Sequence, residues 1–167
     1  MVISWFGLSS FKISSGPLTL ITDPFSKKTG LTPPRGQTDI VVISNPASEF
    51  YNNREAVGDE KTFVVDSPGE YDVKGLFIRG AAANGAAIYS IRMEDMRLGF
   101  LGSLKEQELS DSQVEELGEI DVLFVPVGGP TSADRGETGK TVCDAEEAVN
   151  IVNQLEPRFV IPMHFAQ

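Results

Sequence analysis

The sequence contains one histidine, His164, and one cysteine, Cys143, in 167 residues. A single cysteine excludes an internal disulfide, which is typical of a reducing compartment, and we therefore expect a cytoplasmic protein. A single histidine excludes any metal centre that needs several imidazole ligands. Hydrolytic zinc sites are of this kind, since they combine neutral imidazoles with carboxylates and an open coordination position.

Long hydrophobic runs and positive charge are also scarce. No apolar run approaches the about 20 residues of a membrane-spanning helix, and the first residues lack the basic segment of a signal peptide. Lysine and arginine number 14 against 24 acidic residues, which gives a net charge of −10, and Lys27-Lys28 is the only adjacent basic pair. Such a surface repels phosphate backbones and anionic lipids, so we expect neither a nucleic-acid nor a membrane partner.

The sequence is rich in short apolar segments that end at glycine, proline, asparagine or aspartate, a pattern typical of strands. The runs 39–44 and 121–126 are continuously apolar, as in strands buried on both faces. We predict strands near residues 2–7, 11–15, 18–23, 39–44, 61–66, 71–79, 86–93, 96–102, 121–126 and 158–163.

Helix signals are fewer. The strongest covers 144–155, where Pro157 ends the pattern and the predicted apolar face consists of Ala145, Ala148, Val149, Val152 and Leu155. A shorter helix with a capping-box start is predicted from Ser110 to Gly118, and one or two turns near 52–57. Residues 128–141 have no periodicity and are predicted as a surface loop. These patterns indicate a single α/β domain over 1–167, with stacked mixed sheets and outer helices.

Eight stretches, in this order and spacing, resemble the metallo-β-lactamase superfamily, in particular its small branch similar to ascorbate-6-phosphate lactonase and related zinc-dependent hydrolases. The resemblance covers nearly the whole chain and implies an αββα sandwich of two mixed sheets with outer helices, compact or C-terminally shortened. The matching stretches are residues 5–11, Thr22-Asp23-Pro24-Phe25, 39–44, 68–71, 75–80, Leu101-Gly102-Ser103-Leu104, 121–129 and Ile161-Pro162-Met163-His164.

The resemblance also implies where metal ligands would stand, and most are replaced. A His-x-His-x-Asp-His motif would follow the strand that ends at Ser44. The positions that replace family ligands are Asn45, Ala47, Glu49, Phe50, Ser103 (for a bridging aspartate) and Asn84, while Leu8 replaces a neighbouring histidine. Only Glu49 could still bind a cation, because alanine and phenylalanine have no ligand atoms and asparagine is a weak donor. We therefore predict no metal and no other cofactor.

Three residues are the candidate catalytic groups: His164 as a general acid or base, with Asp23 or Glu49 to orient it. Each also has a structural interpretation, His164 as a hydrogen-bonded core residue and Asp23 as a turn residue. Glu49, Glu70 and Asp72 could form a carboxylate cluster for a hard cation, but a solvated surface explains them better.

Three further interpretations concern the pocket and the core. A serine nucleophile has neither a second histidine nor a nearby lysine to activate it, although five serines are expected around the pocket: Ser9, Ser10, Ser44, Ser48 and Ser103. Cys143 precedes the strongest helix, and we expect it to be buried. Phe50-Tyr51 are predicted to fill the volume that metal ligands would occupy.

Two hypotheses of function follow from the residues. The first is a non-catalytic protein of this fold with a binding or assembly role, either as a homodimer or other homo-oligomer or with a small-molecule ligand. The second is a hydrolase with an altered or residual metal-dependent mechanism that uses His164. An uncovered strand edge at the end of the chain favours self-association. Nucleic-acid processing is disfavoured by the net charge of −10.

Overall fold

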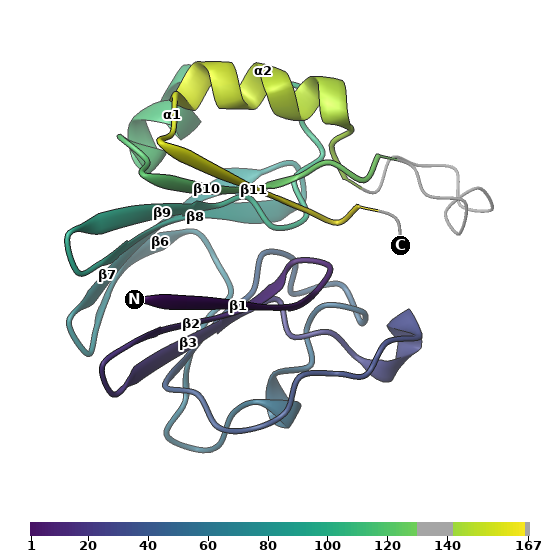
Figure 1. Cartoon of the computed structure of the whole chain (residues 1–167), viewed down its shortest axis with the longest axis vertical. Coiled ribbons are helices and arrows are strands. Elements are labelled where there is room, and N and C mark those ends of the chain that lie inside the picture. Colours follow the sequence, from purple (N-terminus) through teal and green to yellow (C-terminus); the bar gives the residue numbers. More distant parts are fainter. Residues whose placement is uncertain (130–141, 166–167) are drawn as a thin grey trace.

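The computed structural model describes residues 1–129 and 142–165. Two mixed β-sheets pack face to face, and two α-helices cover the outer face of one of them (Figure 1). This confirms the predicted sandwich of two mixed sheets. Most of the predicted loop at 128–141 lies outside the described residues. None of the described helices has the length and apolar character needed to cross a membrane.

The first sheet has five strands in the order β1-β2-β3-β4-β5. Its first three strands form an antiparallel meander, and β3, β4 and β5 run parallel. The bounds are β1 Val2–Gly7, β2 Ser10–Ser15, β3 Leu18–Thr22, β4 Ile40–Val42 and β5 Phe63–Val65.

The second sheet has six strands in the order β11-β10-β9-β8-β7-β6. Strands β6 to β9 are antiparallel, whereas β9, β10 and β11 run parallel. The bounds are β6 Gly69–Val73, β7 Leu76–Ala83, β8 Ala86–Met93, β9 Met96–Phe100, β10 Val122–Pro126 and β11 Phe159–Met163. Parallel strands of both sheets end near the site described below, where the backbone N–H of Ala87 reaches across to the Ser44 carbonyl at 2.7 Å.

Helices α1 (Asp111–Leu117) and α2 (Ala145–Leu155) lie over the six-stranded sheet, as Figure 1 shows, and both begin with capping boxes. Two 3₁₀ turns, η1 (Lys27–Thr29) and η2 (Arg54–Ala56), follow strands of the other sheet. The buried apolar residues form three groups: one between the sheets, one beneath the helices and a small one next to η2. The alternation of buried and exposed positions along β7 and the fully buried β10 follow from this layering.

Several elements differ from the prediction. The strand predicted at 71–79 is a hairpin of β6 and β7, because Lys74 and Gly75 both have positive φ and turn the chain. By contrast, the turn predicted near 52–57 is present, as the single 3₁₀ turn η2. The buried face of α2 is Ala148, Ile151 and Leu155, whereas Val149 is exposed. The helix is therefore rotated relative to the predicted face, although Pro157 ends it as expected.

Candidate functional site

A buried carboxyl group, Asp23, lies directly after β3 at the edge where the parallel strands end. Its backbone N–H donates to Val42 O at 2.9 Å, so Asp23 still pairs with β4 beyond the last strand residue. The hydroxyl of the preceding Thr22 accepts from the Phe11 N–H and donates to Ser9 O, and these bonds connect the end of β3 to the start of β2. Asp23 is thus held by its own backbone bond to β4 and by the bonds of the neighbouring Thr22 hydroxyl.

Ser44 is the centre of a closed hydrogen-bond network. Its backbone N–H donates to Asp23 Oδ1 at 2.7 Å, and its hydroxyl donates to Asp23 Oδ2, also at 2.7 Å. The same hydroxyl oxygen accepts from Ser103 N–H at 3.0 Å, and the Ser103 hydroxyl lies 3.4 Å away. All three side chains are buried. Ser44, which follows β4, is therefore bonded to Asp23 after β3 and to Ser103 after β9.

Burial raises the pKa of Asp23 from 3.8 to about 6, while hydrogen bonds from Ser44 and a contribution from Ser9 act in the opposite direction. A carboxyl with this pKa is partly protonated near neutral pH. Asp23 is nevertheless unsuited to act as a base for Ser44, because both side chains have 0% of their surface exposed and a substrate cannot reach them. The arrangement is that of a structural network rather than a nucleophile and its base.

The raised pKa of Asp23 predicts a pH effect on stability. Between about pH 4 and 6 the folded state holds the Asp23 proton more strongly than the unfolded state, so this group's contribution falls by about 3 kcal/mol as the pH rises. Asn in place of Asp23 mimics the protonated acid. Urea unfolding from pH 4 to 7 should show wild type losing stability relative to Asp23→Asn with rising pH, and an opposite trend would contradict the raised pKa.

Gly102 packs against this network more closely than any side chain would allow. Its φ is +47°, and a Cβ placed there would lie 2.1 Å from Ser44 Cβ and 3.2 Å from Asp23 Oδ2. The glycine is therefore required by both the left-handed backbone and the close approach.

His164 lies after β11, with 6% of its surface exposed and φ +57°. Its backbone N–H donates to Leu8 O at 3.3 Å, and the Tyr51 ring meets the imidazole edge-on with centroids 5.1 Å apart. A side chain at Gly128 would collide with His164 O, since the Cβ would be 1.8 Å away. His164 is thus packed among core elements.

The loop after Ser44 does not bring its predicted residues together at Asp23. Asn45 is half-buried, Ala47 is exposed, and Glu49 forms a surface ion pair with Lys28. Phe50 is 42% exposed, so the prediction that it fills the pocket was wrong. The loop residue that packs inward is Tyr51, against His164.

The remaining predicted positions have local roles. Asn84 is exposed in the turn between β7 and β8, next to Gly85 with φ +82°, and is explained as an Asn-Gly hairpin residue. Glu70 pairs with Arg79 and Glu49 with Lys28, and within residues 1–129 and 142–165 Glu49, Glu70 and Asp72 do not form a cluster that could hold a cation. Cys143 is buried, as expected, with its sulfur 2.9 Å from Glu106 O.

The donor set does not fit a zinc ion. Within residues 1–129 and 142–165, no three His, Cys, Asp or Glu side chains lie close enough to hold a metal. At the position of the expected bridging aspartate stands Ser103, whose neutral hydroxyl faces Ser44. Zinc sites need anionic or imidazole ligands, and hydroxyls are weak substitutes.

Sequence reasoning missed the central role of Ser44 and the contact of Tyr51 with His164. The sequence places Ser44 beside the expected pocket, since it ends a buried strand directly before the replaced motif, but its bonds with Asp23 and Ser103 leave no local signal. The contact of Tyr51 with His164 joins residues far apart in the chain and leaves no local signal.

The comparisons with known proteins agree with this fold. A family model described as a beta-lactamase superfamily domain matches residues 2–164. A solved structure described as a candidate Zn-dependent hydrolase of the metallo-beta-lactamase superfamily, from Thermotoga maritima, is 31% identical with a TM-score of 0.78, and the match covers 99% of this chain and 76% of that one.

Two further matches are more distant. A UPF0173 protein of Pyrococcus abyssi is 22% identical, over 99% of this chain and 83% of its own length. The metallo hydrolase Igni18 from Ignicoccus hospitalis is similar in structure, with 18% identity and a TM-score of 0.64, over 98% of this chain and 82% of that one. At this identity, the second likeness concerns the fold alone.

Proposed function

We start from the premise that this chain belongs to the beta-lactamase superfamily, and we propose that it serves as a metal-free binding or assembly protein rather than as a metallohydrolase. The fold supports a hydrolase-related origin for any activity. The residues at the site support the absence of zinc chemistry.

The observation that carries the proposal is the closed network of Asp23, Ser44 and Ser103. The Asp23 carboxyl accepts from the Ser44 backbone N–H and the Ser44 hydroxyl, both at 2.7 Å, and the Ser44 hydroxyl oxygen accepts from the Ser103 backbone N–H at 3.0 Å. In a zinc enzyme of this fold, a charged bridging ligand would be expected at Ser103. Here the network joins the ends of β3, β4 and β9 by hydrogen bonds, which supports a structural replacement for metal coordination.

The alternative, a hydrolase that uses His164, has less support from the geometry. Its proposed orienting group Glu49 is engaged by Lys28 on the surface, and Asp23 is engaged by Ser44. His164 itself is 6% exposed, which limits access of a substrate to the imidazole.

The strand edges support an assembly role. Strand β11 is one edge of the six-stranded sheet and β1 one edge of the five-stranded sheet, and the tilted rings of Trp5 and Phe165 lie there with centroids 5.1 Å apart. Phe159 is 60% and Val2 63% exposed. Exposed apolar edge strands favour pairing with another chain, and we propose a second copy of this chain.

One preparation tests both parts of the proposal. Protein grown with added zinc is assayed on phosphoesters, lactones and thioesters, and its mass is measured by light scattering. We expect no turnover above buffer, no change in His164→Ala, and the mass of two or more chains. Turnover that disappears in His164→Ala would establish the hydrolase instead, and a monomer would remove the self-assembly part.

A further inference from the structure

Three arginines meet on the outer face of the six-stranded sheet, although the sequence shows no basic patch. Arg79, Arg92 and Arg97 come from the neighbouring strands β7, β8 and β9. The strand register pairs Arg79 with Ser90 and Arg92 with Arg97, and cross-strand partners share a face. Together with Phe77 and Glu116 they line a cavity of about 230 Å³ beside α1. This cavity is called the arginine pocket below.

The positive charge of this pocket is only partly compensated. Arg79 pairs with Glu70 at 3.1 Å and with Glu116 at 3.6 Å. In the described part of the chain, no carboxylate forms an ion pair with the guanidinium of Arg92 or Arg97. These two arginines stand directly opposite each other, and like charges in that position destabilise a sheet. An unneutralised pair is unexpected in a chain with a net charge of −10.

A purely structural role explains only one of these two arginines. The Arg97 guanidinium lies against Gly118 at the C-terminal end of α1, where a Cβ would be 2.5 Å from its Nη1. Carbonyl groups at a helix C-terminus attract a cation, so Arg97 has a structural role there. Arg92 is exposed and stands in the pocket without an ion pair to any residue of 1–129 or 142–165.

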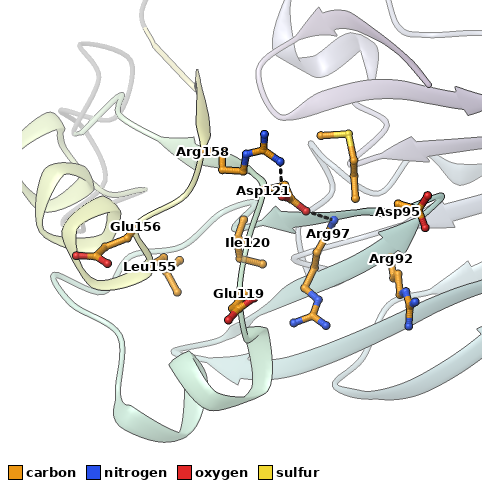
Figure 2. Close-up of a pocket in the computed structure, with 10 residues that line it drawn as sticks. Arg92, Asp95, Arg97, Glu119, Ile120, Asp121, Leu155, Glu156 and Arg158 are labelled. Carbon is orange, nitrogen blue, oxygen red and sulfur yellow. Dashed lines mark hydrogen bonds and ion pairs between the residues drawn. The ribbon is translucent and has the colours of Figure 1, made fainter.

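A larger neighbouring cavity of about 560 Å³ shares Arg92 and Arg97 but has the opposite charge balance. Figure 2 shows both arginines extending to the same side of the sheet, with Asp121 bound to Arg158 and to the Arg97 backbone. Four carboxylates and three arginines line this cavity, whereas one glutamate and three arginines line the arginine pocket. An anion is therefore favoured in the smaller cavity.

We propose that the arginine pocket binds a small phosphate-class anion, either inorganic phosphate or a phosphomonoester. Guanidinium groups bind phosphate oxygens in a bidentate manner, and two adjacent ones match a dianion. The buried Ser90 lies on the same face and offers a hydroxyl donor. Phe77, 39% exposed under the Arg79 guanidinium at 5.7 Å, offers an apolar wall for an organic group.

The arginine pocket lies at the far ends of β8 and β9 from Ser44 and Ser103. The phosphate proposal is therefore independent of whether the chain is a hydrolase. Phosphate should raise the melting temperature by about 2–4 °C more than chloride at equal ionic strength. Calorimetric titration with inorganic phosphate and with phenyl phosphate separates the two sources. Tighter binding of phenyl phosphate would identify a phosphomonoester site that uses Phe77, and equal binding a site for the free anion.

Variants decide which arginines act. Arg92→Gln and Arg97→Gln should each weaken phosphate binding about tenfold or more, while Arg158→Gln, which lines only the larger cavity, should leave it unchanged. Without phosphate, Arg92→Gln should be at least as stable as wild type, since it removes a like-charge pair. Arg92→Lys keeps the charge and should lose part of the affinity. The absence of a phosphate-specific shift, or an equal loss in Arg158→Gln, would overturn the proposal.

Discussion

Gly102→Ala is expected to destabilise the protein by about 4 kcal/mol, or about 8–16 °C in melting temperature. The new methyl group would lie 2.1 Å from Ser44 Cβ and 2.2 Å from its Oγ. Rotation of the Ser44 side chain cannot relieve a clash with Cβ, so the backbone after β4 or β9 must move. Such a movement breaks the hydrogen bonds of Ser44 with Asp23 and Ser103.

The control for this variant is Gly75→Ala. Gly75 also has a positive φ, +82°, but nothing lies within 4 Å of the position that its new Cβ would take. It should cost only the left-handed backbone penalty of about 1 kcal/mol. Urea unfolding of both variants measures the difference. If Gly102→Ala costs no more than Gly75→Ala, the network is looser than described and does not fix the ends of these strands.

A chain carrying Asn45→His, Ala47→His, Glu49→Asp, Phe50→His and Ser103→Asp is expected to gain zinc binding. These changes supply the imidazoles and carboxylates that the family resemblance places there, beside the existing His164. The overall fold matches the Thermotoga maritima structure at a TM-score of 0.78, and the loop after β4, which leaves Ala47, Glu49 and Phe50 exposed here, would have to fold inward around the ion. Bound zinc at 100 times its dissociation constant would stabilise the fold by about 2.7 kcal/mol.

Two measurements follow this gain: zinc retained after desalting, and the melting temperature with and without chelator. Adding His164→Ala to the same chain is the control, and it should lower zinc retention because one imidazole is removed. If the chain with all five changes retains no zinc, the backbone of the loop after β4 departs from a metal-binding geometry. The replaced side chains alone would then not explain why, as proposed, this chain binds no zinc.

Local sequence patterns predicted most strands and the start of both helices. The capping residues Ser110 and Asp144 and the stop at Pro157 all act within a few residues, where the sequence carries the signal. The missed hairpin at Lys74-Gly75 also has a local signal, but the continuous β pattern around it concealed the turn. The exposed Val149 shows that the buried face of a helix depends on how the helix packs against the sheet, which the local sequence does not specify.

The site and the arginine pocket depend on contacts between distant residues. The loss of ligand types after Ser44 is visible in the sequence, but the bond of Ser44 with Asp23 spans 21 positions and that with Ser103 spans 59. Arg79 and Arg92 come together only through strand register. A single sequence shows directly which ligand residue types are missing, but it does not show which long-range contacts form at the same place.

According to the proposed function, the network of Asp23, Ser44 and Ser103 stands where the family resemblance implies a metal centre. Plasma mass spectrometry of protein purified without an affinity tag tests this central claim most directly, together with melting in chelator and in added Zn²⁺, Mn²⁺ or Mg²⁺. We expect no stoichiometric metal and no shift in the melting temperature. Near-stoichiometric zinc with a chelator-sensitive melt would contradict the claim.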